Sequence, residues 1–112
     1  MSEVLALARA LAEAFRDSPE LAAYRFAKAA VLSDPALARR LAEYKQALFG
    51  HRMKAASGET PPFDEEKILS HMYSELFLND RTREFLEREE AAFGLVNGIG
   101  EILGEAYGEM EM

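Results

Sequence analysis

The residues of this 112-residue sequence best suited to chemistry are two histidines and a set of paired carboxylates. His71 stands four residues before Glu75, so a helix would place both side chains on one face, as in half of a metal site. No Glu-x-x-His pair of the di-iron type is present, and nothing supplies the remaining ligands. His51 lies near the apolar seam of a predicted helix. We therefore expect a surface ion pair at His71 or no interaction there at all, and no metal or other cofactor.

Acid–base and nucleophilic catalysis find no better support. The adjacent acids Glu65-Glu66 and Glu89-Glu90 point in different directions on a helix, so neither pair makes a catalytic dyad. The serines have no nearby His–acid arrangement, and the absence of cysteine excludes thiol catalysis, disulfides and thiolate-ligated metal centres. The expectation is a protein that is not an enzyme.

Two helix starts organise the chain around these residues. Ser18 precedes Pro19 and Asp34 precedes Pro35. A short polar side chain can accept from the free N–H groups of a first helical turn, and proline at the next position has its φ already set for a helix. The pattern predicts one helix over residues 19–32, a sharp break, and another helix beginning at Pro35.

The helix predicted over residues 19–32 has apolar residues on two sides. Phe26 and several alanines point away from the main apolar stripe, which consists of Leu21, Tyr24, Ala27, Val31 and Leu32. A helix that is apolar on both sides is usually buried between neighbours, so we expect it at the centre of the fold.

Three more helices complete the prediction. The first covers residues 2–16, and the helix from Pro35 ends between Lys54 and Gly58, before a Gly- and Pro-rich loop at about 57–63. Asp64 should cap a fourth helix that stops near residue 78, and Asn79 or Asp80 should cap a fifth that runs to about Gly108. The fold class is all-α, a five-helix bundle with a long C-terminal helix and no sheet. We expect a single helical domain over residues 1–112, with a disordered tail at about 108–112.

The fifth predicted helix carries an apolar seam with the spacing of a helix that packs along a partner. It includes Phe85, Val96, Ile99 and Leu103, and Glu89 interrupts it. If Glu89 is inside, a hydrogen-bond donor should face it, with Arg25, Tyr24 and the helix start at Ser18 as candidates. The glycines of this helix either admit another helix or lie in solvent. The expected interaction surface consists of Phe26, Phe85, Glu89, Val96, Ile99 and Leu103.

The net charge of −7 is unevenly distributed. Residues 84–112 hold eight acids and one base, whereas residues 21–58 hold seven bases and two acids. This asymmetry can serve packing between the two regions, within or between chains, or the basic region can contact RNA. The third reading is that both regions are simply solvated helix faces. With neither a glycine-rich phosphate loop nor an aromatic platform, we expect no direct binding of nucleic acid. No apolar run reaches the roughly 20 residues of a membrane span, and no signal peptide is recognisable, so we expect a cytoplasmic protein.

The order of these motifs resembles the YlbF/YmcA family of small helical bacterial regulators. The resemblance begins with Ser-Pro-Glu-x-x-x-Tyr-x-x-Ala-Lys from Ser18 and Asp-Pro-x-x-x-x-x-Leu from Asp34. It continues in the run from Asn79 to Glu89 and covers roughly residues 4–107.

The resemblance implies a protein–protein adaptor that assembles with itself, as a dimer or higher oligomer, or with paralogues, and that joins a further protein partner. The resemblance implies that family assemblies affect competence, sporulation and biofilm formation by modulating an endoribonuclease that matures messenger RNA. Some of them carry iron–sulfur clusters, a feature that cannot extend to a chain without cysteine as a thiolate-ligated site. Two alternatives from the residues stay open: an RNA-contacting module that uses the basic second and third helices, and a bundle that binds a metal or small molecule.

Overall fold

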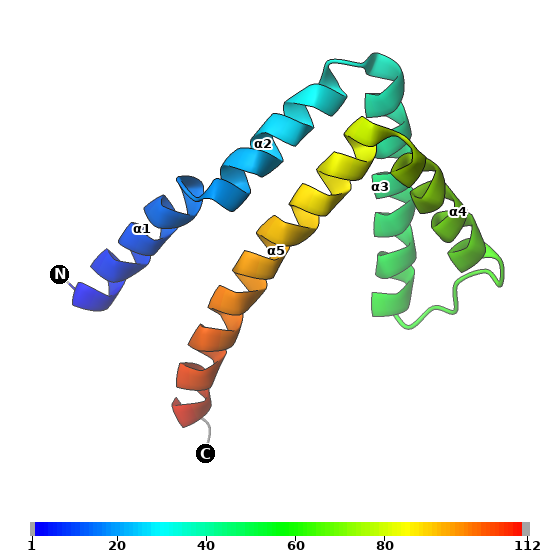
Figure 1. Ribbon diagram of the computed structural model, residues 1–112. Coiled ribbons are helices and arrows are strands. Elements are labelled where there is room, and N and C mark those ends of the chain that lie inside the picture. Colours follow the sequence, from blue (N-terminus) through cyan, green and yellow to red (C-terminus); the bar gives the residue numbers. More distant parts are fainter. Residues whose placement is uncertain (1, 111–112) are drawn as a thin grey trace. The chain divides into compact units, whose positions relative to one another are not determined.

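Five α-helices followed by a short 3₁₀ turn make up the computed structural model, which describes residues 2–110 (Figure 1). The helices are α1 (Glu3–Arg16), α2 (Pro19–Leu32), α3 (Pro35–Ala56), α4 (Glu65–Leu78) and α5 (Asp80–Tyr107), and the 3₁₀ turn is η1 (Gly108–Met110). Residues 2–110 contain no strand. The prediction of an all-α fold with five helices and a long C-terminal helix is confirmed. Of the tail predicted at 108–112, residues 111 and 112 lie outside the described residues.

Side-chain caps define most helix starts, as the sequence predicts. The Ser18 hydroxyl accepts from the backbone N–H of Leu21 at 3.2 Å. The Asp34 carboxylate accepts from the N–H groups of Ala36 and Leu37 at 3.1 and 3.3 Å. Each cap satisfies donors that the first helical turn leaves without a partner.

The start of α4 differs from its prediction. Asp64 precedes the helix, but its side chain makes no capping hydrogen bond. Its backbone has φ −96° and ψ 1°, whereas a capping residue usually has an extended backbone. The N–H of Glu65 donates to the Pro62 carbonyl at 3.0 Å, so a backbone turn precedes the helix.

The start of α5 resolves an alternative. Asn79, and not Asp80, is the cap: its side-chain oxygen accepts from the N–H groups of Arg81 and Thr82 at 2.9 and 3.5 Å. Thr82 is fully buried, and its hydroxyl donates to the Leu76 carbonyl. The turn between α4 and α5 is therefore held by side-chain hydrogen bonds on both sides of Asn79.

The described chain divides into two compact units. Unit 1 comprises Met1–Phe26 and Glu87–Met112, and unit 2 comprises Ala27–Leu86. Unit 2 contains α3 and α4 packed against each other, with the rings of Tyr44 and Tyr73 5.8 Å apart. Its buried residues come from four helices: Ala27, Val31, Leu37, Tyr44, Leu69, Leu76, Thr82, Phe85 and Leu86.

Helix α2 is buried along one side only. Ala27 and Val31 are buried, whereas Phe26 is 81% exposed and Leu32 is 59% exposed. The expectation that this helix lies buried between neighbours is therefore wrong for the chain by itself. The second apolar side consists mainly of alanines, which present little surface to bury, and residues 2–110 contain no further helix to cover it.

Candidate functional site

The most polar cluster in unit 2 joins the C-terminal half of α3 to the first turn of α4. His51 Nδ1 lies 2.9 Å from Glu65 Oε1, and Lys54 Nζ lies 3.0 Å from Glu65 Oε2. The side chains of His51 and Glu65 are 17% and 18% exposed. The hydrogen bond from Lys54, followed by that from His51, lowers the pKa of the Glu65 carboxyl group. This cluster is a polar clamp across the 57–64 loop, and sequence spacing did not reveal it.

The His71–Glu75 pair predicted from the sequence is present on the surface of α4. His71 Nε2 lies 2.8 Å from Glu75 Oε1, and Arg40 lies 3.6 Å from the other oxygen of Glu75. All three side chains are about half exposed or more. Within residues 2–110, no group of three or more His, Asp or Glu side chains could hold a metal ion. The pair therefore contributes at most a weak surface interaction.

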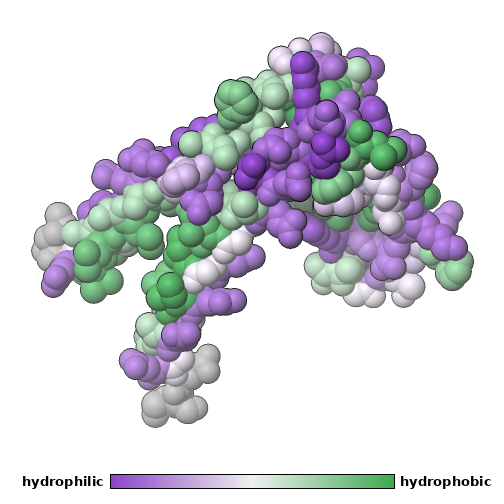
Figure 2. Space-filling view, in the orientation of Figure 1, coloured by the Kyte–Doolittle hydropathy of each residue, from purple (hydrophilic) through white to green (hydrophobic). Residues whose placement is uncertain are grey.

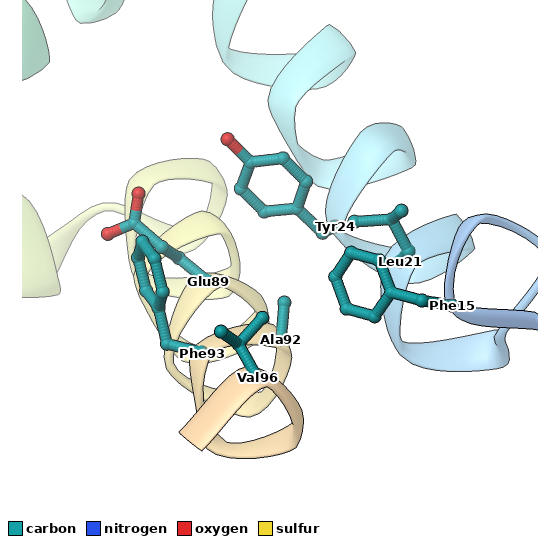
Figure 3. A pocket seen from close by; sticks show the side chains of 7 residues that line it. All are labelled: Phe15, Leu21, Tyr24, Glu89, Ala92, Phe93 and Val96. Carbon is teal, nitrogen blue, oxygen red and sulfur yellow. The ribbon is translucent and has the colours of Figure 1, made fainter. Parts of the chain in front are cut away.

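A largely apolar pocket lies within unit 1, between the end of α1, the first half of α2 and the middle of α5. We call it the Glu89 pocket, and it is lined by Phe15, Leu21, Tyr24, Glu89, Ala92, Phe93 and Val96. Its volume is about 180 Å³. Figure 3 shows Phe15, Leu21 and Tyr24 on one side of the pocket and the four α5 residues on the other. Six of the seven lining residues are apolar or aromatic, so Glu89 supplies the only carboxylate.

Glu89 is half-buried in this pocket, and Tyr24 faces it from the opposite helix (Figure 3). Tyr24 was one of three donors expected to lie near a buried Glu89. Arg25, the second, donates instead to the Arg16 carbonyl at 3.1 Å. The third candidate was the start of α2 at Ser18. There the N–H of Leu21 donates to the Ser18 hydroxyl, so this N–H group is already used within α2.

Beyond this pocket, unit 1 exposes a second set of large apolar side chains. We call them the distal face: Val4, Leu7 and Leu11 of α1 with Ile102, Leu103 and Tyr107 of α5. Their exposed fractions run from 41% to 73%. Figure 2 shows hydrophobic residues along the parts of α1 and α5 nearest the two ends of the chain. Helix α1 is strongly amphipathic and yet has no buried residue.

The six residues predicted as an interaction surface fall in different environments. Phe26, Val96 and Leu103 are exposed, and Glu89 and Ile99 are half-buried. Phe85 is only 4% exposed and belongs to the core of unit 2, where Lys45 Nζ lies 5.9 Å from its ring centroid. The structure brings Glu89 and Val96 together in one pocket.

The sequence prediction missed the contributions of Phe15, Leu21 and Phe93 to this pocket. By helical spacing, Phe15 lies on the apolar stripe of residues 2–16 and Leu21 lies on that of residues 19–32. These stripes were the sequence signal that could have pointed to the two residues. Phe93 lies beside the seam of α5, so heptad spacing excluded it.

No helix of the described residues is long and apolar enough to cross a membrane.

Comparison with known proteins gives a matching family and several related solved structures. The family model for the control of competence regulator ComK, YlbF/YmcA, matches residues 4–106. A search of curated protein sequences gives no significant match.

Two of the related structures cover nearly the whole chain. A protein of unknown function (DUF964) from Bacillus stearothermophilus has a TM-score of 0.85 at 19% identity, over 97% of this chain and 96% of its own. RicA of Bacillus subtilis in complex with RicF has a TM-score of 0.61 at 20% identity, over 96% and 95%. At these identities the likeness establishes the fold.

Proposed function

Since the chain belongs to the YlbF/YmcA family of competence regulators, we propose that it is a non-enzymatic regulatory adaptor that binds other proteins through unit 1. The observation that carries the proposal is the distal face, whose six large apolar side chains are all at least 41% exposed. Grouped apolar surface of this kind marks contact sites, because its removal from water contributes about 25 cal/mol per Å².

Helix α1 supplies the clearest case. Its apolar stripe is regular over the whole helix, but none of its residues is buried within the chain. The stability of an amphipathic helix comes mainly from burial of its apolar face. A protein surface that covers Leu7 and Leu11 would supply this burial.

The proposed partners are further copies of this chain or a paralogue, with an additional protein partner in the assembly. The solved complex of RicA with RicF supports a role in a protein complex. We propose that the assembly modulates RNA processing and developmental pathways, as the family resemblance implies, and that it acts in the cytoplasm. The non-enzymatic part of the proposal rests on the regulatory character of the family.

An RNA-contacting module is the alternative, and the contacts of α3 favour protein binding over it. Three of the five basic residues of α3 have partners in unit 2. Arg40 lies 3.6 Å from Glu75, Lys54 lies 3.0 Å from Glu65, and Lys45 lies over the ring of Phe85. A surface that binds phosphates needs its cations available for counterion release.

Light scattering after size-exclusion chromatography tests the proposal. The full chain at about 50 µM should form an assembly larger than a monomer, since assembly depends on protomer concentration. The double variants Leu7→Ser/Leu11→Ser and Ile102→Ser/Leu103→Ser should shift it toward monomer while circular dichroism stays helical. Phe63→Ser, which changes a 94% exposed aromatic residue of unit 2, is the matched control and should leave assembly unchanged. A monomeric wild-type chain would contradict the proposed assembly.

A further inference from the structure

Helix α3 carries an apolar stripe on the side opposite its contact with α4. Phe49 and Met53 stand one helical turn apart and are 66% and 53% exposed. Ala42 and Ala56, two turns before and after Phe49, extend the stripe and are also exposed. At about 100° per residue, Phe49 lies half a turn around the helix from Arg40, whose side chain pairs with a glutamate of α4. We call Ala42, Phe49, Met53 and Ala56 the α3 stripe, and grouped exposed apolar surface of this kind marks contact sites.

Two arginines border the α3 stripe. Arg39 and Arg52 lie about 80° and 60° from Phe49, in opposite directions around the helix. Both arginines are exposed. Helix α3 as a whole holds five arginines and lysines and one acid, Glu43. A partner surface complementary to the stripe therefore presents exposed apolar side chains with carboxylates beside them.

The C-terminal part of α5 has this composition. Ile102 and Tyr107, which belong to the distal face, are 69% and 66% exposed. Glu101 and Glu105 lie about 100° and 60° from Ile102, on the same side of it, and both are exposed. Residues 89–112 contain six glutamates and no basic residue. One chain thus carries both complementary surfaces, the α3 stripe in unit 2 and the acidic part of α5 in unit 1.

We propose that the α3 stripe of one chain binds the C-terminal part of α5 in a second copy. In this contact Phe49 and Met53 pack against Ile102, and the two bordering arginines face the carboxylates of Glu101 and Glu105. The inference rests on the proposed assembly and specifies which surface of the second copy covers the α5 part of the distal face. Because the contact joins two different surfaces, a pair of chains leaves one surface of each kind free. Such a head-to-tail contact builds a ring if its rotation closes, and otherwise an open row of subunits.

Two other occupants match the α3 stripe less well. A second α3 stripe would place arginines opposite arginines, and like charges at an interface lower affinity. RNA binding depends on several cations that replace counterions along a phosphate backbone. Here Arg39 and Arg52 lie about 20 Å apart along the helix and on opposite sides of an apolar surface.

Light scattering of charge-reversal variants after size-exclusion chromatography tests the inference on the full chain. At about 50 mM salt, Arg39→Glu/Arg52→Glu and Glu101→Lys/Glu105→Lys should each weaken assembly at least about tenfold, and the loss should shrink at about 300 mM salt. All four changes in one chain should restore assembly, because the reversed charges attract each other again. The fourfold variant also has the net charge of the wild-type chain, so its rescue cannot come from a change in overall charge.

Two further variants test the apolar part of the contact and its location. Phe49→Ser/Met53→Ser removes the two largest side chains of the α3 stripe, both exposed, and should shift the chain toward monomer while circular dichroism stays helical. Lys67→Glu/Arg81→Glu reverses two exposed bases of unit 2 outside the stripe. It is the matched control for Arg39→Glu/Arg52→Glu and should assemble like the wild-type chain.

The outcomes separate this inference from the proposed function. A wild-type chain that assembles, together with a Phe49→Ser/Met53→Ser variant that assembles equally well, contradicts only the inference. Lack of rescue in the fourfold variant also contradicts it, because a contact between two α3 stripes would then place glutamates opposite glutamates. A labelled single-stranded RNA that binds the wild-type chain but not Arg39→Glu/Arg52→Glu would assign the arginines to RNA and overturn the inference. A monomeric wild-type chain contradicts the proposed assembly and the inference with it.

Discussion

The Nδ1 atom of His51 lies 2.9 Å from Oε1 of Glu65, and this contact joins α3 to the first turn of α4. Lys54 holds the second oxygen of the same carboxylate at 3.0 Å. His51 Nε2 also lies 3.9 Å from Glu66, whose side chain is 85% exposed. The clamp thus closes the loop between the helices with one central carboxylate.

Loss of the Glu65 charge should lower stability in a pH-dependent way. Lys54 first, and His51 second, lower the pKa of Glu65 in the folded state. A carboxylate with a lowered folded-state pKa stabilises the protein above its unfolded pKa, about 4.3 for glutamate, and this contribution is lost as the pH falls through the folded-state pKa. Glu65→Gln should therefore lower the thermal midpoint at pH 7 more than at pH 3. Glu66→Gln is the matched control, and an equal loss at both pH values would argue against the charge as the cause.

The helix caps give a second prediction. Asn79→Ala removes the side-chain oxygen that accepts from Arg81 and Thr82 and should cost about 1 kcal/mol in the free energy of unfolding. Asp64→Ala should change the free energy of unfolding by less than about 0.5 kcal/mol, because the Asp64 side chain makes no capping hydrogen bond. Urea denaturation of both variants measures the difference, and equal losses would contradict the observed caps.

Local patterns in the sequence predicted the helices well because the physical causes are local. The caps at Ser18, Asp34 and Asn79 act on N–H groups two or three residues away, so residue type and spacing suffice. Asp64 is a residue type that often caps helices, but its backbone is not extended and its side chain makes no capping hydrogen bond, so residue type alone did not suffice there.

The sites depended on contacts that spacing does not encode. His51 and Glu65 are 14 residues apart across a loop, and the sequence does not determine the path of that loop. The Glu89 pocket needs α2 and α5 to meet at a specific register, so an apolar seam pointed to Glu89 and Val96 but not to Phe93. Phe85 shares the seam of Val96 and is nevertheless buried, because heptad spacing does not show which part of a helix the chain itself covers.

The two sides of α2 give a third prediction. Val31 is fully buried, so Val31→Ala should lower the free energy of unfolding by about 2 kcal/mol through the lost apolar contact and the cavity left behind. Phe26→Ala changes an 81% exposed residue and should stay within about 0.5 kcal/mol for the monomer. Denaturation at low protein concentration compares them. A large loss for Phe26→Ala that grows with protein concentration would instead show that assembly covers this side of α2.

The glycines of α5 carry the last prediction. A Cβ atom added at Gly94 or Gly98 would meet nothing within 4 Å in the chain. Alanine is favoured over glycine by about 1 kcal/mol in a helix interior because glycine loses more backbone entropy on folding. Gly94→Ala and Gly98→Ala should therefore each raise the free energy of unfolding by about that amount, as measured by urea denaturation.

Their effect on assembly decides whether this part of α5 is packed or solvated. By helical spacing, Gly94 and Gly98 lie away from the seam that contains Glu89 and Val96. If solvent covers them, light scattering should find the same assembly in the variants as in the wild-type chain. A variant that is more stable as a monomer but assembles less would show that another helix approaches α5 closely here, since small residues four apart permit such an approach and an added methyl group obstructs it.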